Sequence, residues 1–224
     1  MEKLDINISR PEVLRYLGYR GGIIDGHVAE QIDAACDKVL ASIDIKYIYA
    51  ACPLDRSNGL SLKGTVFTLT GKDICLHLKG CHSAIIMAVT LGENLDTEIR
   101  RTQISDMTLA TIMDAAADAA VESACSALHS KLERGFAQKH LTGRFSPGYG
   151  DMPLSQQEPL CRVLDTERRI GLRVNNSFVL FPQKSVTALI GISDSEIIWA
   201  GADCEDCNLR QSCEYRKAGK TCAK

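Results

Sequence analysis

The sequence predicts an α+β fold, in which a twisted antiparallel or mixed sheet packs with a long central helix and several shorter helices. The apolar run from Ala84 to Leu91 is typical of a buried strand. The segment from Asp106 to about His140 has no proline, a single glycine and many alanines, a composition that favours one long helix. Strands and helices are mixed along the chain without a regular β–α repeat, which favours an α+β architecture.

The N-terminal part is predicted to contain two helices and a strand. Ser9, just before Pro11, opens a short helix that runs through Leu17. Residues 26–42 form an amphipathic helix, because apolar side chains recur there at helical spacing: Val28, Ile32, Ala35, Val39 and Ile43. Residues 45–51 alternate in strand fashion and are rich in β-branched residues and tyrosine.

The middle of the chain leads from this strand to the long helix. Residues 61–70 are predicted to form a second strand or an extended arm. Asp73 is expected to cap a short helix that ends at Gly80. The apolar strand at residues 83–90 is then followed by a helix from Glu93.

After the long helix, the chain is predicted to pass through an irregular segment into a helix and two strands. The irregular segment is Thr142–Pro153, and the helix covers Ser155–Leu164. The strands cover Ser177–Phe181 and Ser185–Ile192, and the turn between them lies at Pro182.

The bulk composition is that of an ordinary soluble globular protein. The 224 residues include 45% hydrophobic and 24% charged residues, and the formal charge of −2 gives no overall basic field for nucleic acid or an anionic membrane. A solvated helix face accounts for the local group Arg162, Arg168 and Arg169. Met1–Arg10 lacks the apolar core of a signal peptide, and Ala84–Leu91 is too short to span a bilayer. We therefore expect a cytoplasmic protein with no nucleic-acid partner and no membrane partner.

Four of the ten cysteines crowd into the last 21 residues, at Cys204, Cys207, Cys213 and Cys222. The two-residue gap of the first pair lets both sulfurs reach one ion or cluster, so this tail is predicted to hold an iron–sulfur cluster or zinc. A tail of free thiols is the alternative. The domain prediction is accordingly a main domain at residues 1–200 and a cysteine-rich tail at residues 201–224.

The Thr142–Pro153 segment has the chemistry of a binding loop. Its three glycines let backbone groups approach a ligand closely, and Arg144 offers a planar fork that fits a carboxylate or phosphate. Tyr149 adds a flat face and one hydrogen bond, and Pro147 restricts the backbone. A rigid structural loop is the alternative interpretation.

Three blocks of sequence resemble the reactivation domain of cobalamin-dependent methionine synthase. Arg144-Phe145-Ser146-Pro147-Gly148-Tyr149-Gly150-Asp151-Met152-Pro153 resembles the family signature Arg-x-x-Pro-Gly-Tyr-x-x-x-Pro. Ala117-Asp118-Ala119-Ala120-Val121-Glu122, followed by Leu128-His129, resembles the family helix that presents an acidic residue to the ligand. Ser177-Phe178-Val179-Leu180-Phe181-Pro182, with Ser185-Val186, resembles the family's strand pair. Tyr16-Leu17-Gly18-Tyr19 and Thr90-Leu91-Gly92 look like features of its short, free-standing members.

The resemblance implies a site for S-adenosylmethionine. The residues expected to bind it are Glu122, Arg144, Ser146, Pro147, Gly148 and Tyr149. Arg144 would pair with the carboxylate of the ligand, and Glu122 would balance its ammonium or sulfonium group. An ordinary exposed helix glutamate is the alternative for Glu122, and a plain core tyrosine is the alternative for Tyr149.

The function implied by the resemblance is reductive reactivation of a corrinoid. In this chemistry an inactive cob(II) cobalamin is reduced by one electron, and the resulting cob(I) attacks the methyl group of S-adenosylmethionine. The protein needs no catalytic side chain, because the cobalt is the nucleophile. The family's Asp-x-His-x-x-Gly cobalamin stretch is absent. The expected partners are therefore the corrinoid-binding domain of a separate methyltransferase, such as methionine synthase, and a low-potential electron donor.

This function would make the chain a component of a cobalamin-dependent methionine synthase system in methionine biosynthesis. The alternative is a metal-bearing redox or adaptor protein that docks on corrinoid proteins without using S-adenosylmethionine.

Overall fold

The computed structural model describes residues 3–19, 21, 24–65 and 68–196, and these form two compact units. Unit 1 comprises the described residues of Met1–Ala50, Met87–Gly135 and Gln157–Thr187. Unit 2 comprises those of Ala51–Ile86 and Phe136–Gln156 and those from Ala188 onward. In the part of the chain that the structure describes, no helix is both long and apolar enough to cross a bilayer.

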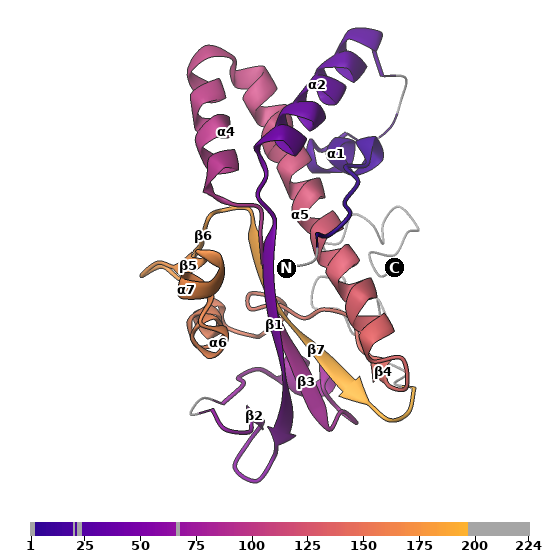
Figure 1. Cartoon of the computed structure of the whole chain (residues 1–224), viewed down its shortest axis with the longest axis vertical. Helices are drawn as coiled ribbons and strands as arrows, with labels where there is room; N and C mark the ends of the chain where they lie inside the picture. The colour runs from indigo at the N-terminus through magenta and orange to yellow at the C-terminus, as the bar shows by residue number, and fades with distance from the viewer. Residues whose placement is uncertain (1–2, 20, 22–23, 66–67, 197–224) are drawn as a thin grey trace. The chain divides into compact units, whose positions relative to one another are not determined.

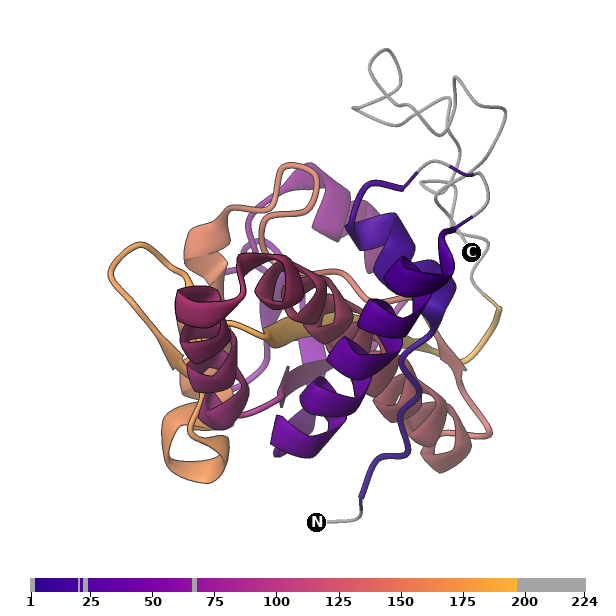
Figure 2. The same cartoon turned by 90° about the horizontal axis from the view of Figure 1, so that it is seen from above.

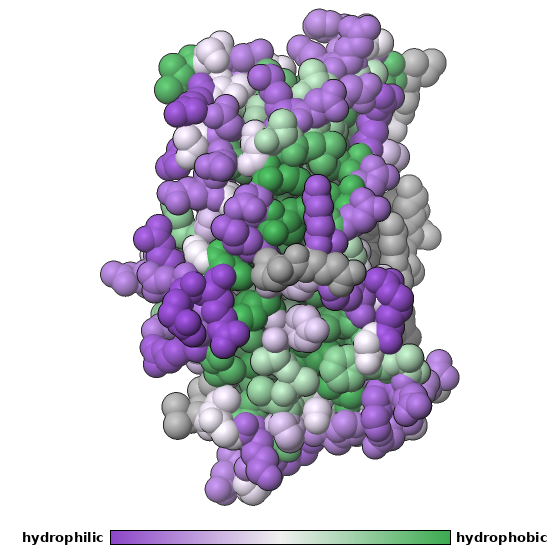
Figure 3. Space-filling model, in the orientation of Figure 1, coloured by the Kyte–Doolittle hydropathy of each residue, from purple (hydrophilic) through white to green (hydrophobic). Residues whose placement is uncertain are grey.

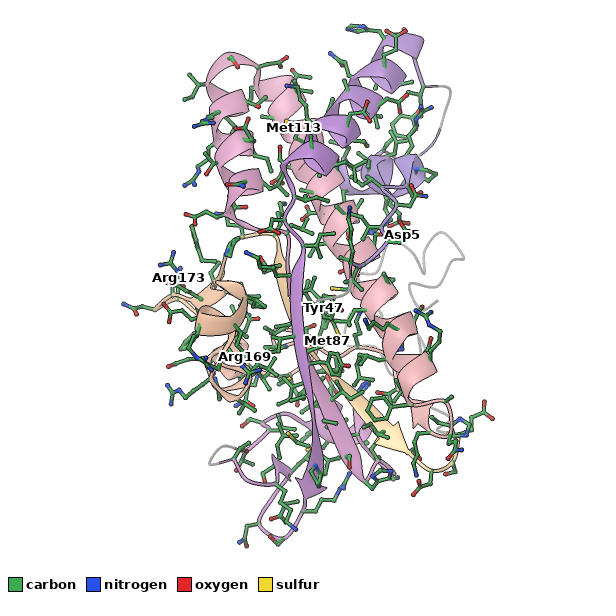
Figure 4. The ribbon with its side chains drawn as sticks, viewed as in Figure 1. Asp5, Tyr47, Met87, Met113, Arg169 and Arg173 are labelled. Atoms are coloured by element: carbon green, nitrogen blue, oxygen red, sulfur yellow. The ribbon has the colours of Figure 1, made fainter. Side chains whose placement is uncertain are left out.

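Unit 1 is built around a long helix, α5 (Met107–Gly135). Three helices pack on it: α1 (Arg10–Tyr16), α2 (Gly26–Ser42) and α4 (Glu93–Ser105). Figures 1 and 2 show α2 and α4 lying beside α5. Most alanines of α5 are buried, because their small side chains let the neighbouring helices approach its backbone, and Met113 (labelled in Figure 4) is buried among them.

The ends of α5 correct the predicted span of the long helix. The side chain of Asp106 accepts a hydrogen bond from the Leu109 N–H (2.9 Å), so this residue caps α5 and separates it from α4. The helix ends at Gly135 and does not reach His140, because a turn follows and His140 begins the short strand β4 (His140–Leu141). The single glycine of the segment therefore marks the end of the helix.

The chain from Leu154 to Phe181 forms short elements, some of which the sequence did not predict. The predicted 155–164 helix is a 3-10 turn followed by α6 (Gln157–Leu164), and it precedes the unpredicted helix α7 (Thr166–Ile170). A small two-stranded sheet joins β5 (Arg173–Val174) to β6 (Leu180–Phe181). The predicted strand at 177–181 is shorter because Phe178 has a left-handed backbone (φ 61°) and interrupts it.

The segment around α6 and α7 forms a hydrophilic surface, drawn purple at the left of Figure 3. Arg162 pairs with Glu158 (2.6 Å), and Arg168 pairs with Asp165 (2.5 Å). The four side chains are between 45% and 76% exposed, so these are local pairs on a solvated face, as the sequence predicted.

The main sheet has the strand order β2-β1-β3-β7-β4, and its three long strands contribute residues to both units. These strands are β1 (Lys46–Asp55), β3 (Ser83–Thr90) and β7 (Ser185–Ser193). The backbone bonds that flank β1 and β3 join Asp44 to Leu91 and Leu54 to His82, and those that flank β3 and β7 join Leu91 to Lys184 and His82 to Ile192. Both pairs are therefore antiparallel, and the predicted α+β fold is confirmed.

Unit 2 contains the short elements β2 (Ser61–Leu62), α3 (Lys72–His77) and β4. Among the described residues of the predicted strand or arm at 61–70, β2 is a two-residue strand, which pairs antiparallel with Leu54 and Asp55 of β1. The prediction that Asp73 caps the following helix is wrong. Gly71 is the cap residue, and the first amides of α3 are bound by the side chain of Asp151 instead.

Candidate functional site

The segment that carries the predicted binding residues is a loop of unit 2 between β4 and the helices that follow it. Arg144 and Ser146 are half-buried, and Pro147 is buried. Tyr149 is 58% exposed, and Gly148 beside it has a left-handed backbone (φ 92°). The loop therefore holds its arginine partly sheltered and presents a tyrosine face and a glycine backbone to solvent, which suits a small polar ligand.

The start of the loop is joined to the edge of the sheet. The N–H of Phe145 donates to the carbonyl of Leu189 on β7 (2.9 Å), and the N–H of Leu189 donates back to the carbonyl of Phe145 (2.8 Å). A turn follows, because the Tyr149 N–H donates to the Ser146 carbonyl (3.1 Å). Arg144 and Ser146 therefore flank a residue that is paired like a strand residue, and this pairing fixes their backbone.

The far end of the loop is locked to α3 by two aspartates. The carboxylate of Asp151 accepts the N–H groups of Lys72 (2.7 Å) and Asp73 (3.0 Å), and the carboxylate of Asp73 accepts the N–H of Asp151 (3.2 Å). These backbone hydrogen bonds lower the pKa of Asp151 below its usual value, because they favour the ionised form. The approach is so close that a Cβ on Gly150 would overlap the carboxylate of Asp73.

A buried histidine lies under the beginning of the loop. The Nε2 atom of His77 is 3.0 Å from the carbonyl oxygen of Gly143 and 2.9 Å from the hydroxyl of Thr142. Its ring also contacts Phe145, with 5.1 Å between ring centroids, and Phe145 in turn meets Tyr149 edge-on at 6.3 Å. Burial lowers the pKa of His77 to about 4, so the ring is neutral at physiological pH.

The predicted acidic residue, Glu122, lies in unit 1 on α5, where it is half-buried. Asp118 lies one turn before it, and Tyr16 of α1 is close to both. Burial is the main cause that raises the pKa of Tyr16, and the negative charges of Glu122 and Asp118 raise it further. The structure thus places two carboxylates and an aromatic ring together in unit 1.

A lysine that the sequence did not single out is paired with this row of acids. Lys184 follows the Pro182 turn, and its side chain is 10% exposed. Its Nζ donates to Asp118 (2.7 Å) and lies 2.9 Å from Asp114. Burial alone would lower the pKa of Lys184, but its hydrogen bonds to the two aspartates raise it above its ordinary value. Asp118 therefore has a structural partner within unit 1.

The strand pair quoted in the resemblance fixes the position of this lysine. The hydroxyl of Ser185 donates to the Pro182 carbonyl (2.7 Å), and its oxygen lies 2.8 Å from the hydroxyl of Thr90, which can donate to it. The Gln183 N–H donates to the carboxylate of Asp96 (2.7 Å). These contacts fix the two residues that flank Lys184 in the chain, Gln183 and Ser185.

The predicted residues of the loop, from Arg144 to Tyr149, therefore lie together in unit 2, and Glu122 belongs to unit 1. His77 was not predicted as a site residue, because a lone histidine among apolar residues forms no motif. The predicted metal ligands Cys204, Cys207, Cys213 and Cys222 lie outside the described residues. Within the described residues, no group of three His, Cys, Asp or Glu side chains could hold a metal ion.

A shallow polar groove of about 310 Å³ lies elsewhere in unit 1. It is lined by Asp5, Ile6, Asn7, Ser123, Ser126, Ala127 and Ser130. Figure 4 labels Asp5, which belongs to the N-terminal segment, and the Asn7 N–H of that segment donates to the hydroxyl of Ser123 (3.0 Å). The groove is therefore the seam between this segment and α5.

No protein-family model and no curated protein matches the chain. Among solved structures, the crystal structure of the MetH reactivation domain bound to AdoHcy is similar, with a TM-score of 0.59 and 15% sequence identity. The match covers 95% of this chain and 77% of that chain. At this level of identity the likeness shows the fold, and the fold is the one that the three sequence blocks implied.

Proposed function

We propose that the chain is an S-adenosylmethionine-binding factor for the reductive reactivation of a corrinoid held by a separate methyltransferase, such as methionine synthase. One observation carries the proposal. The Arg144–Tyr149 loop is held at both ends in unit 2 with its arginine half-buried and its tyrosine exposed, in a chain whose fold is that of an AdoHcy-bound reactivation domain. Such a loop needs little reorganisation to receive a ligand, which reduces the entropy lost on binding.

The roles proposed for the loop follow from the charges of the ligand. Arg144 pairs with its carboxylate, because a guanidinium forms two parallel hydrogen bonds to that group. Ser146, Pro147 and Gly148 supply the backbone that borders the ligand, and Tyr149 packs on it. These roles are supported by the loop geometry and by the family signature at the same residues.

Glu122 is proposed to balance the ammonium or sulfonium charge. Support comes from the sequence block on α5, which resembles the family helix that presents an acidic residue to the ligand. A half-buried carboxylate attracts a cation, so Glu122 suits the positive part of the ligand.

The reaction needs orientation of the methyl donor more than acid–base chemistry. The partner's cob(II) takes one electron from a low-potential donor, and the cob(I) formed attacks the methyl carbon. The carbon–sulfur bond breaks, a cobalt–carbon bond forms, and S-adenosylhomocysteine leaves as a neutral thioether. The residues of this chain hold the methyl donor in place.

Calorimetry with S-adenosylmethionine tests the proposal. The wild-type chain is expected to bind the ligand, and Arg144→Ala is expected to weaken binding by about 10- to 100-fold, as for the loss of a charge-assisted hydrogen bond. Arg173→Ala is the matched control, because Arg173 (labelled in Figure 4) is exposed on β5 in unit 1. A wild-type chain that does not bind S-adenosylmethionine would refute the function. Equal binding by Arg144→Ala and wild type would refute the site.

We also propose that Cys204, Cys207, Cys213 and Cys222 hold an iron–sulfur cluster or zinc. The support is their spacing, since four thiolates in a polar tail need a metal to be ordered together. An anaerobic absorption spectrum with metal analysis separates the two metals. A colourless protein with one equivalent of zinc would exclude a role of the tail in electron transfer.

A further inference from the structure

His77 is the one histidine of unit 2 that is buried against the proposed binding loop. It ends α3, it is 2% exposed, and its Nε2 points at the carbonyl of Gly143, the residue immediately before Arg144. We propose that His77 is a positioning residue, which sets the backbone before Arg144 by donating its Nε2 proton to the Gly143 carbonyl. The proposal rests on the proposed function of the loop and adds a residue outside the family blocks.

The geometry allows one assignment of the ring proton. A carbonyl oxygen can only accept, so the Nε2 atom 3.0 Å from it must carry the hydrogen. The hydroxyl of Thr142, also 2.9 Å from Nε2, already accepts the N–H of Gly191 (2.8 Å) and donates to the same Gly143 carbonyl (3.0 Å). All of these contacts are satisfied when the neutral ring is protonated on Nε2, and they are not satisfied by the other tautomer.

Thr142, which contacts the ring of His77, connects the histidine to strand β7. Thr142 donates its N–H to the carbonyl of Gly191 (3.0 Å), so Thr142 and Gly143 are fixed from the β7 side as well. The ring of His77 also contacts the ring of Phe145 in a tilted arrangement, with 5.1 Å between the centroids. Arg144 therefore lies between two residues, Gly143 and Phe145, that His77 contacts directly, and a change in His77 moves the backbone on both sides of the arginine.

An NMR experiment on the wild-type chain identifies the tautomer of His77. In a two-bond proton–nitrogen correlation spectrum of the full chain, His77 is expected to show the pattern of a neutral ring protonated on Nε2. A ring protonated on Nδ1 would overturn the proposal, since its Nε2 could not donate to Gly143.

Two substitutions at His77 distinguish the effect of its hydrogen bond from the effect of its packing. His77→Gln keeps a donor near the position of Nε2, whereas His77→Leu fills the space with an apolar side chain. Amide hydrogen exchange without ligand is expected to be about tenfold faster at Tyr149 and Met152 in the Leu variant, and near the wild-type rate in the Gln variant. His82→Leu is the control, because His82 is a half-exposed histidine of the same unit.

The same variants are then titrated with S-adenosylmethionine. About tenfold weaker binding by His77→Leu, with recovery to within about threefold of wild type in His77→Gln, supports the proposal. Equal exchange and equal affinity in the Leu variant and wild type would overturn it, as would a Gln variant as impaired as Leu. If wild type does not bind the ligand while loop exchange still depends on the donor, the proposed function fails and the positioning role stands.

Discussion

At the scale of single residues, Lys184 balances the charges of two aspartates on α5. Its buried ammonium lies between Asp114 and Asp118, and the hydrogen bonds to both outweigh the cost of burial. We expect Lys184→Met to lower the free energy of unfolding by about 1–3 kcal/mol, because it leaves partly sheltered carboxylates without their cation. Urea denaturation measures the change. As a control, Lys139→Met removes the exposed pair with Asp194 and should change the free energy of unfolding by less than about 1 kcal/mol. A similar loss of stability in both variants would contradict the stabilising role of Lys184.

The buried ring of His77 makes the stability of the fold depend on pH. Burial lowers the folded-state pKa of His77 from 6.5 to about 4, so between these values the unfolded chain binds a proton that the folded chain does not. Stability must therefore fall as the pH falls from 6.5 to about 4, by about 3 kcal/mol in total. His77→Gln removes this component, so its urea midpoint should depend less on pH than that of wild type. Parallel pH profiles for the two proteins would show that the ring is not buried as a neutral group.

At the scale of elements, the loop and α3 form one structural unit through reciprocal aspartates. Asp151 has a folded-state pKa below its ordinary value, so the stabilisation it gives is present above the ordinary pKa and is lost as the pH falls through the folded value. We expect Asp151→Asn to lower the melting temperature at pH 7, and the difference from wild type to shrink as the pH falls below about 4. Asp37→Asn, on an exposed position of α2, is the control, and a deficit in Asp151→Asn that does not change with pH would contradict the capping role.

Thr142, just before the binding loop, packs closely against Gly191 of β7. A Cβ on Gly191 would overlap the sulfur of Cys81 and come within 3.0 Å of the Thr142 methyl group and 3.1 Å of Leu78. Gly191→Ala is therefore expected to cost about 1–3 kcal/mol of stability, as overpacking of a close-packed core does. The double variant with Cys81→Gly restores the room and should recover most of the loss in a chemical denaturation experiment. A single variant as stable as wild type would mean that the strand and Thr142 are less closely packed than the distances imply.

At the scale of the whole molecule, the sequence predicted the elements that local patterns determine. The helix at 26–42 and the apolar strand at 83–90 were found within the predicted bounds, because periodicity and a continuous apolar run depend on few long-range contacts. The left-handed backbone of Phe178 was not predicted, and its carbonyl accepts a bond from the Gln157 side chain (2.9 Å), which is 21 residues away. The partners of Asp151 and His77 are also more than sixty residues away, so no local signal pointed to them.

The proposed function involves a partner as well as the full chain, and a reconstituted reaction tests it. The full-length chain is mixed with the cob(II) form of a corrinoid methyltransferase, a low-potential reductant and S-adenosylmethionine labelled on its methyl group. Because the reduced cobalt is the nucleophile, label should move to the corrinoid only when all components are present, and the cob(II) absorption should give way to that of the methylated form. Arg144→Ala should slow the transfer at low ligand concentration and recover in part at high concentration, since its proposed role is binding and not chemistry. Transfer at the same rate without this chain would show that the partner reactivates itself, and the chain would then act as a redox or adaptor protein.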